Sequence, residues 1–344
     1  MSLELYTPDY SNRYEISHAI SVQMSNYYND VGKLILVLPV NDYNIEAMKN
    51  DSILYDTQKK VAYIIKNVKI DTPQNRITAN GYTTNQLLES RVISSTVAVS
   101  NVENGVYSTV NENMRGMERV STAPTKGLSE ETEISLYGKS VLEQIMPVLT
   151  SVELGHKMAW DYRSEKHIFE VYKGNDLTTG IHAVVFSDEQ GTARDLIIND
   201  DVSTFKNVAY VVSKFKDGNT EKELVEIVGD ATGSDRHEKW LEVTLSKEDG
   251  ETESQFRARM RTHGAMELGK LIRRQSFSVV IDPAELGVLY NIGDLVSCVS
   301  KRFGVKFNAR ISGMKYKKDA NSETTEVVLG EPKLTAIGEV KLSG

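Results

Sequence analysis

Short apolar segments divided by polar turns recur through the first part of the chain, and they limit its fold more than any other feature. The segments 52–56 and 61–70 flank the polar turn Thr57–Lys60, which predicts a hairpin. One exception, residues 85–91, reads as a short turn of helix. Strands this short and evenly spaced are typical of a small barrel or sandwich. The predicted strands are 33–38, 52–56, 61–70 and 76–82.

Residues 94–130 break this pattern. The stretch is rich in Ser, Thr, Asn, Val and Glu, and Pro124 and Gly127 lie near its end. We expect an exposed loop or a partner-binding excursion here, with ordered and disordered forms both open.

A small α+β domain is predicted over 131–182. Pro147 lies inside its helix and lacks an amide donor, which predicts a kink or an early helix end. Two strands, 157–162 and 167–172, follow as a hairpin, so a helix packed on a small sheet is the simplest architecture. The apolar face of the helix is formed by Val141, Leu142, Ile145, Met146 and Leu149.

A third unit is predicted from residue 183 onward. Its clearest helix runs from about Thr252 to Arg274, with Ser254 as the expected cap. Residues 207–212 and 222–228 form an expected hairpin. The other predicted strands are 183–187, 276–281, 295–300, 309–314 and 324–329.

Length and charge exclude several classes of protein. A chain of 344 residues is longer than one hydrophobic core usually supports, so two or three domains are expected. The formal net charge of −8 argues against a protein that binds nucleic acid independently of its sequence, because such binding needs a basic surface. The N-terminus has no signal-peptide pattern, and no apolar run approaches the ~20 residues that span a bilayer. We expect synthesis and folding in a cytoplasm.

The single cysteine, Cys298, excludes an intrachain disulfide and lies in an apolar stretch. A buried small side chain is the favoured interpretation, and a reactive thiol is the alternative.

The chain lacks the patterns that catalysis or metal binding requires. The histidines show no i, i+4 pair, and His237-Glu238 lacks the second histidine of a metalloprotease motif. No G-x-S-x-G elbow occurs. The acidic pairs Asp200-Asp201 and Glu130-Glu131 are better explained as solvated positions, because adjacent residues of a strand point to opposite faces. The loop 174–180 lacks the lysine and helix of a phosphate site. We expect no catalytic, cofactor-binding or metal-binding residue.

The order of segments resembles that of siphophage and prophage tail-hub proteins, also called baseplate hub or tail-associated proteins. One shared signature is a strand ending in a glycine, here Gly81, followed by a short helix that ends in Arg91, Val92 and Ile93. The stretches that carry the resemblance are 5–10, 29–39, 53–70, 77–82, 87–93, 169–178, 185–187, 207–211, 233–238 and 290–296.

The resemblance implies a mixed β-rich α+β fold with two small antiparallel β-barrel domains and intervening and peripheral α/β elements. The corresponding domains would be a first barrel over 1–93, the excursion 94–130, the small α+β domain 131–182, a second barrel over 183–335 that carries the 252–274 helix, and a tail over 336–344. Hubs of this kind are trimers whose barrels form a ring with near six-fold symmetry.

The implied role is structural and not enzymatic. The ring joins the tail tube and distal tail ring to the central spike in the virion, with tape-measure and tip proteins as further partners, and DNA passes through without specific binding. Some relatives carry a C-terminal hydrolase or receptor-binding module; this chain stops at Gly344, so we expect no such role of its own. The alternatives are a protein that binds a host surface or polysaccharide, and a peptidoglycan hydrolase. The strands near 33–38, 61–70, 208–212 and 294–299 are expected to line or flank the ring, and 94–129 to reach a neighbour.

Overall fold

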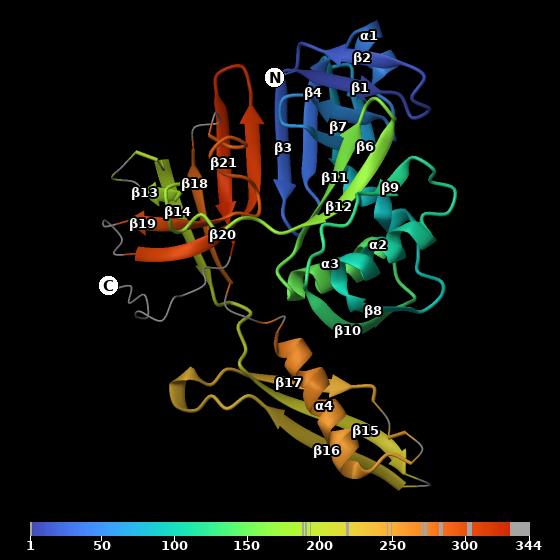
Figure 1. The fold of residues 1–344 in the computed structure, drawn as a ribbon, viewed down its shortest axis with the longest axis vertical. Coiled ribbons are helices and arrows are strands. Elements are labelled where there is room, and N and C mark those ends of the chain that lie inside the picture. The colour runs from blue at the N-terminus through green and yellow to red at the C-terminus, as the bar shows by residue number, and fades with distance from the viewer. Residues whose placement is uncertain are drawn as a thin grey trace. The chain divides into compact units, whose positions relative to one another are not determined.

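The computed structural model describes residues 2–330 except 188, 190, 193, 218–219, 246, 249, 270, 272–273, 282–284 and 301–304 (Figure 1). It forms two compact units. The first consists of Met1–Ile197 and Phe277–Gly344, and the second of Ile198–Ser276. The tail predicted over 336–344 lies outside the described residues. None of the described helices is both long and apolar enough to span a membrane.

The first unit is β-rich, and its main sheet curls into a half-barrel (Figure 1). Neighbouring strands follow the order β14-β18-β21-β20-β3-β4-β7-β6-β5-β1-β2, and β19 pairs with both β20 and β13. The strands are β1 (Leu3–Tyr6), β2 (Arg13–Ile16), β3 (Ser21–Tyr27), β4 (Lys33–Pro39), β5 (Ile53–Asp56), β6 (Val61–Asp71), β7 (Arg76–Thr83), β13 (Val185–Ser187), β14 (Arg194–Asp201), β18 (Arg274–Val280), β19 (Leu295–Ser300), β20 (Val305–Lys318) and β21 (Glu323–Leu329).

Alternation of side chains along β4 explains the core of this sheet. Leu34, Leu36 and Leu38 are buried on one face, whereas the residues between them are wholly or partly exposed. Burial of each leucine contributes roughly 2 kcal/mol. The predicted hairpin of β5 and β6 is confirmed, with Asp56 opposite Val61 across the turn. The predicted short helix is the 3₁₀ helix η1 (Thr84–Ser90), and α1 (Asp42–Ala47) was not predicted.

The pairing of β3 with β20 joins the N-terminal and C-terminal parts of the sheet. The two strands run antiparallel, from Tyr27 opposite Gly313 to Val22 opposite Lys318. A Cβ atom on Gly313 would lie 2.3 Å from the ring of Tyr27, so this pairing requires glycine at that point. Strands nearly three hundred positions apart in the sequence therefore form one continuous surface.

Residues 94–130, expected as a loop, are largely folded. They form β8 (Val97–Asn101), α2 (Val102–Asn113) and β9 (Val120–Thr122). The α2 helix buries Val102, Val106 and Val110, spaced i, i+4, i+8, in a core shared with α3 (Val141–Ser151). The polar residues on its outer face obscured this spacing in the sequence.

The predicted α+β domain contains the expected helix and hairpin. β11 (Gly155–Asp161) and β12 (Lys166–Tyr172) are antiparallel, β9 adds to β12 in parallel, and β10 (Glu131–Leu136) pairs with β8. Pro147 does not end α3, which continues to Ser151. The buried residues Ile145, Val148 and Leu149 hold the helix on both sides of the proline, which offsets the lost hydrogen bond.

The second unit is a three-stranded sheet covered by one helix (Figure 1). It contains β15 (Val208–Asp217), β16 (Thr220–Val228), β17 (Glu238–Val243), the 3₁₀ helix η2 (Gly233–Asp235) and α4 (Glu253–Leu268). The β15–β16 hairpin was predicted; the parallel pairing of β17 with β15 was not. The expected domain 183–335 thus contains a stretch, Ile198–Ser276, that packs as a compact unit by itself.

The ends of α4 differ from the prediction. Thr252, not Ser254, caps the helix, because the Thr252 side chain accepts a hydrogen bond from the Gln255 backbone N–H and the Gln255 side-chain oxygen accepts one from the Thr252 backbone N–H. The helix ends at Leu268 instead of Arg274, and Arg274 opens β18.

Candidate protein-protein interface

The four segments expected to line or flank the ring lie on, or directly beside, strands of the fold. Residues 33–38 belong to β4 and 61–70 to β6, and β7 lies between these two strands. Residues 294–299 fall mainly on β19, which connects to the same sheet through β20. Residues 208–212 belong to β15 of the second unit. The structure therefore brings three of the four segments into one sheet.

The sheet face opposite the leucine core is partly apolar. Ile35 on β4 and Tyr82 on β7 are each more than one-third exposed, and Tyr82 lies opposite Lys33 in the register. Ile35 lies opposite Asn80, so polar and apolar side chains alternate on this face. Such mixed composition is ordinary for protein interfaces, which are no more apolar overall than other surfaces.

Tyr28 forms hydrogen bonds to three separate segments of the first unit. Its backbone N–H donates to the Ser312 carbonyl at 2.9 Å, and its carbonyl accepts from the His156 N–H at 2.9 Å. Its hydroxyl oxygen lies 3.0 Å from the Glu153 carbonyl oxygen and 3.1 Å from that of Tyr172. Burial raises the pKa of Tyr28, so the hydroxyl remains protonated.

Arg310 completes this junction. Its guanidinium lies 5.4 Å from the centre of the Tyr28 ring, donates to the Gly293 carbonyl and pairs with Glu153 at 3.3 Å. A Cβ atom on Gly155 would lie 2.1 Å from the Tyr28 ring. The close packing ties β20 and the α+β domain to one side chain.

The chain segment after β12 is held on β19 by a buried carboxylate. Asp294 accepts hydrogen bonds from the backbone N–H groups of Asn175 at 2.8 Å and Asn291 at 2.7 Å. The loop 174–180, which lacks the features of a phosphate site, is thus anchored near its start by the Asp294 carboxylate. Gly174 is required there, because a Cβ atom would lie 1.8 Å from the Gly293 carbonyl oxygen.

Two buried histidines lie where the first sheet meets the α+β domain. Burial lowers the pKa of His156 and of His167 to about 4, and for His167 the nearby Arg119 guanidinium adds to the effect. The indole of Trp160 packs between the rings of Tyr6, Tyr10 and His167. Sequence reasoning dismissed these histidines as lacking ligand spacing and did not foresee their packing role.

Cys298 is buried in β19, and burial raises the pKa of its thiol to about 12. The thiolate is therefore negligible at neutral pH, which favours the packing interpretation over a reactive thiol.

The acidic pairs considered in the sequence lie on or beside different elements of the fold. Glu130 pairs with Lys173 at 2.6 Å, while Glu131 lies on β10 as an exposed strand residue. Asp200 and Asp201 lie on β14. Among the described residues, no three His, Cys, Asp or Glu side chains gather in a geometry that holds a metal ion.

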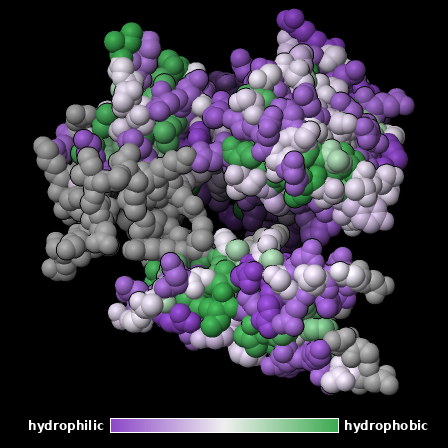
Figure 2. All heavy atoms as spheres, turned by 60° about the horizontal axis from the view of Figure 1, so that its bottom comes forward, coloured by the Kyte–Doolittle hydropathy of each residue, from purple (hydrophilic) through white to green (hydrophobic). Residues whose placement is uncertain are grey.

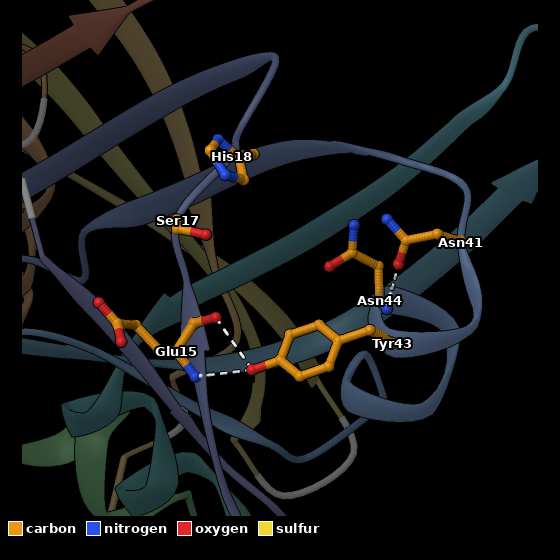
Figure 3. A pocket seen from close by; sticks show the side chains of 6 residues that line it. All are labelled: Glu15, Ser17, His18, Asn41, Tyr43 and Asn44. Carbon is orange, nitrogen blue, oxygen red and sulfur yellow. Dashed lines mark hydrogen bonds between the residues drawn. The ribbon is translucent and has the colours of Figure 1, made fainter.

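One shallow pocket of about 200 Å³ lies between β2 and α1 (Figure 3). The Tyr43 hydroxyl spans it, accepting from the Glu15 N–H at 3.0 Å and lying 3.1 Å from the Glu15 carbonyl oxygen. These contacts join the short helix to the strand. The lining residues are Glu15, Ser17, His18, Asn41, Tyr43 and Asn44.

Comparison with known proteins gives a family and a fold. The model of the family described as Siphovirus ReqiPepy6 Gp37-like protein matches residues 2–331. No curated protein matches the sequence.

Three solved structures share the fold over nearly their whole length. A tail protein from Neisseria meningitidis MC58 has a TM-score of 0.59 and 12% identity, with 96% of each chain covered. A 43 kDa tail protein of prophage MuSo2 from Shewanella oneidensis has a TM-score of 0.57 and 11% identity, covering 96% of this chain and 97% of that chain. Prophage tail protein gp18 from Listeria monocytogenes EGD-e has a TM-score of 0.51 and 12% identity, covering 97% and 96%.

Proposed function

This chain belongs to the Siphovirus ReqiPepy6 Gp37-like protein family, and on that basis we propose that it is a structural hub protein of a phage, or phage-derived, tail tip or baseplate. Its fold is shared with prophage tail proteins, which supports a place in the tail of a virion. The role is one of assembly, not catalysis.

In the proposed arrangement, three copies form a ring. Each copy contributes two barrel domains, one from residues 1–93 and one from the strands within 183–335, so that six barrels surround the axis. Residues 94–130 and the small α+β domain 131–182 lie outside the barrels. The ring joins the tail tube and distal tail ring to the central spike, and also contacts the tape-measure protein.

The observation that carries this proposal is the antiparallel pairing of β3 with β20. It fixes the N-terminal and C-terminal sheet sections side by side within one chain, which a ring with two barrels per copy requires. The segments 33–38, 61–70 and 294–299 then supply surface to the ring, and 208–212 flanks it. In the proposed ring, barrels that close also cover strand edges, which would otherwise be free to pair with other chains.

DNA that leaves the virion passes through this ring without specific binding. The formal net charge of −8 fits such a channel, because like charges repel the phosphate backbone.

Native mass spectrometry of the purified chain tests the proposal, alone and mixed with the neighbouring tail gene products. We expect a trimer, alone or on addition of the distal tail protein, and a ring by negative-stain electron microscopy. A chain that stays monomeric with every neighbour present would refute the hub. Cell-wall clearing in a zymogram would instead support the hydrolase alternative.

A further inference from the structure

The strand β2 forms one edge of the main sheet of the first unit. Its only partner among the described strands is β1, with Leu3 opposite Ile16 and Tyr6 opposite Arg13. The backbone N–H and C=O groups on the outer side of an edge strand can pair with a strand from another chain. On the face shown in Figure 2, hydrophilic side chains lie between the apolar patches of the first unit. Pairing at a sheet edge needs no apolar patch, because backbone groups supply the contacts.

Both outward backbone groups of Glu15 on β2 are bound by one side chain. The Glu15 N–H donates to the Tyr43 hydroxyl at 3.0 Å, and that hydroxyl donates to the Glu15 carbonyl oxygen at 3.1 Å (Figure 3). In an antiparallel pair, alternate residues direct both groups toward the partner or both away from it, so Glu15 faces away from β1. A hydroxyl both donates and accepts, so Tyr43 takes the place that one residue of an added strand would occupy.

The helix α1 holds Tyr43 in this position. Ala47 at its end and Met48 directly after it are buried in the leucine core of the sheet. The side-chain amide of Asn44 donates to the Pro39 carbonyl at 2.9 Å, which ties the start of the helix to the end of β4. Tyr43 therefore projects from a helix that is anchored at both ends.

The ring of Tyr43 also packs against β2. It meets the ring of Tyr14 edge to face, with the centroids 5.4 Å apart and the planes at 76°. The Tyr14 hydroxyl in turn donates to the Glu46 carboxylate of α1 at 3.0 Å. The short helix therefore contacts two consecutive residues of a strand that is only four residues long.

The sequence of β2 favours a second copy of the same strand as the partner that Tyr43 excludes. If two copies pair antiparallel with Tyr14 at the centre, Arg13 of each lies opposite Glu15 of the other. Arg13 and Glu15 are two positions apart, so their backbone groups point to the same side of the strand and both pairs would be hydrogen-bonded. The register within one chain places Glu4 opposite Glu15, and like charges in such a pair repel each other. An arginine from a second copy would offset that repulsion.

The present contact of Arg13 does not prevent this pairing. Its guanidinium lies 3.6 Å from the Glu4 carboxylate, and its side chain is 62% exposed. Surface ion pairs of this kind contribute little to stability, so the guanidinium can turn to a second carboxylate at small cost. Because β2 is so short, the paired edges would form a weak complex that depends on the protein concentration.

We propose that Tyr43 guards the edge of β2 against strand pairing with a second copy of this chain. The hydroxyl occupies the backbone groups of Glu15, and the ring fills the space of the incoming strand. Without this guard, two chains join through a two-fold contact with β2 of each copy at its centre. The guard acts within one chain and does not depend on the proposed ring.

Hydrogen exchange of the full chain tests the contact itself. Tyr43→Phe keeps the ring against Tyr14 and removes only the hydroxyl, so the fold should persist. We expect the Glu15 amide to exchange at least about tenfold faster than in the parent, because its N–H loses its acceptor. Tyr137→Phe changes a tyrosine that is 61% exposed and should leave that rate as it is. An unchanged exchange rate in Tyr43→Phe would overturn the proposal.

Sedimentation velocity tests the identity of the excluded partner. Tyr43→Ala removes both the ring and the hydroxyl, and with rising protein concentration it should associate beyond the state of the parent, whereas Tyr137→Ala should sediment as the parent does. Adding Arg13→Glu to Tyr43→Ala should abolish this association, and adding Glu15→Arg as well should restore it, since opposite charges then face each other again. If Tyr43→Ala does not associate, or if Arg13→Glu leaves its association unchanged, β2 of a second copy is not the excluded partner and the proposal is wrong.

Discussion

The hydroxyl of Tyr10 lies 2.9 Å from Nε2 of His167, although the two residues are 157 positions apart. The contact joins the loop after β1 to β12, so the first sheet and the α+β domain share a buried polar cluster. His156 lies in β11, with its Nδ1 3.1 Å from the side-chain nitrogen of Asn85.

Stability should therefore fall as the pH drops from about 6.5 to about 4. In that window His156 and His167 are neutral in the folded chain, whereas the unfolded chain binds a proton at each, so acid favours unfolding. The loss is at most ~3 kcal/mol for each histidine. Urea denaturation at pH 7, 5.5 and 4.5 measures it. A His167→Gln variant should show a shallower pH dependence than the parent; equal slopes for the two proteins would contradict this explanation.

Substituting Gly174 should destabilise the first unit strongly. In Gly174→Ala the new Cβ atom would meet the Gly293 carbonyl oxygen at 1.8 Å, which forces the segment after β12 away from β19. We expect a loss of about 2 kcal/mol or more in thermal or urea denaturation. Gly127→Ala is the control, since Gly127 has a φ of +73° but nothing within 4 Å of the new atom. The control carries only the backbone strain of its positive φ, which Gly174 does not have, so a loss at Gly174 no larger than at Gly127 would argue against the steric explanation.

Removing the Asp294 carboxylate should cost about 3 kcal/mol, because two backbone N–H groups lose a charged acceptor in a buried position. Asp319→Ala is a close control. Asp319 also accepts from two backbone N–H groups, of Asn321 and Ser322 at 2.9 Å each, but it is partly exposed. Chemical denaturation of Asp294→Ala and Asp319→Ala should give a clearly larger loss for the first; similar losses would show that burial is irrelevant here.

The folded state of 94–130 should depend on Glu103. This buried carboxylate accepts from the backbone N–H of Lys126 at 2.6 Å and of Leu128 at 2.9 Å, and so ties the end of the segment to α2. Glu103→Ala should release the chain near Lys126 and speed its cleavage by trypsin about tenfold. Glu112→Ala, on the exposed side of α2, should cleave as the parent does. Rapid cleavage at Lys126 in the parent itself would contradict the packed arrangement.

Cys298 should resist thiol reagents in the native chain. Its buried thiol, with a pKa raised to about 12, is protonated at pH 8 and reacts only when β19 opens. Labelling with a chromogenic disulfide should therefore be slow without urea and complete within minutes in 6 M urea, a rise of at least about 100-fold. Fast labelling of the native protein would revive the reactive-thiol interpretation.

Local patterns in the sequence determined most of the strands and three of the helices. Three examples are the alternation in Lys33–Leu38, the turn between β5 and β6, and the apolar helical face that starts at Val141. Each pattern extends over only a few residues, so it can be recognised in the sequence without knowledge of the fold. The helix α2 was not predicted by such local patterns. Its valines have the right spacing, but only the core they share with α3 outweighs the polar composition around them.

Only the tertiary structure determined which distant segments of the chain pack against each other. The sequence does not encode locally that Gly313 lies opposite Tyr27, that three segments contact Tyr28, or that Ile198–Ser276 packs as its own unit. Each depends on contacts between residues far apart in the chain, whose free energy is set by the shape of both partners. Short-range periodicity determines which residues form a strand or helix, and long-range packing determines which surfaces are left for other proteins.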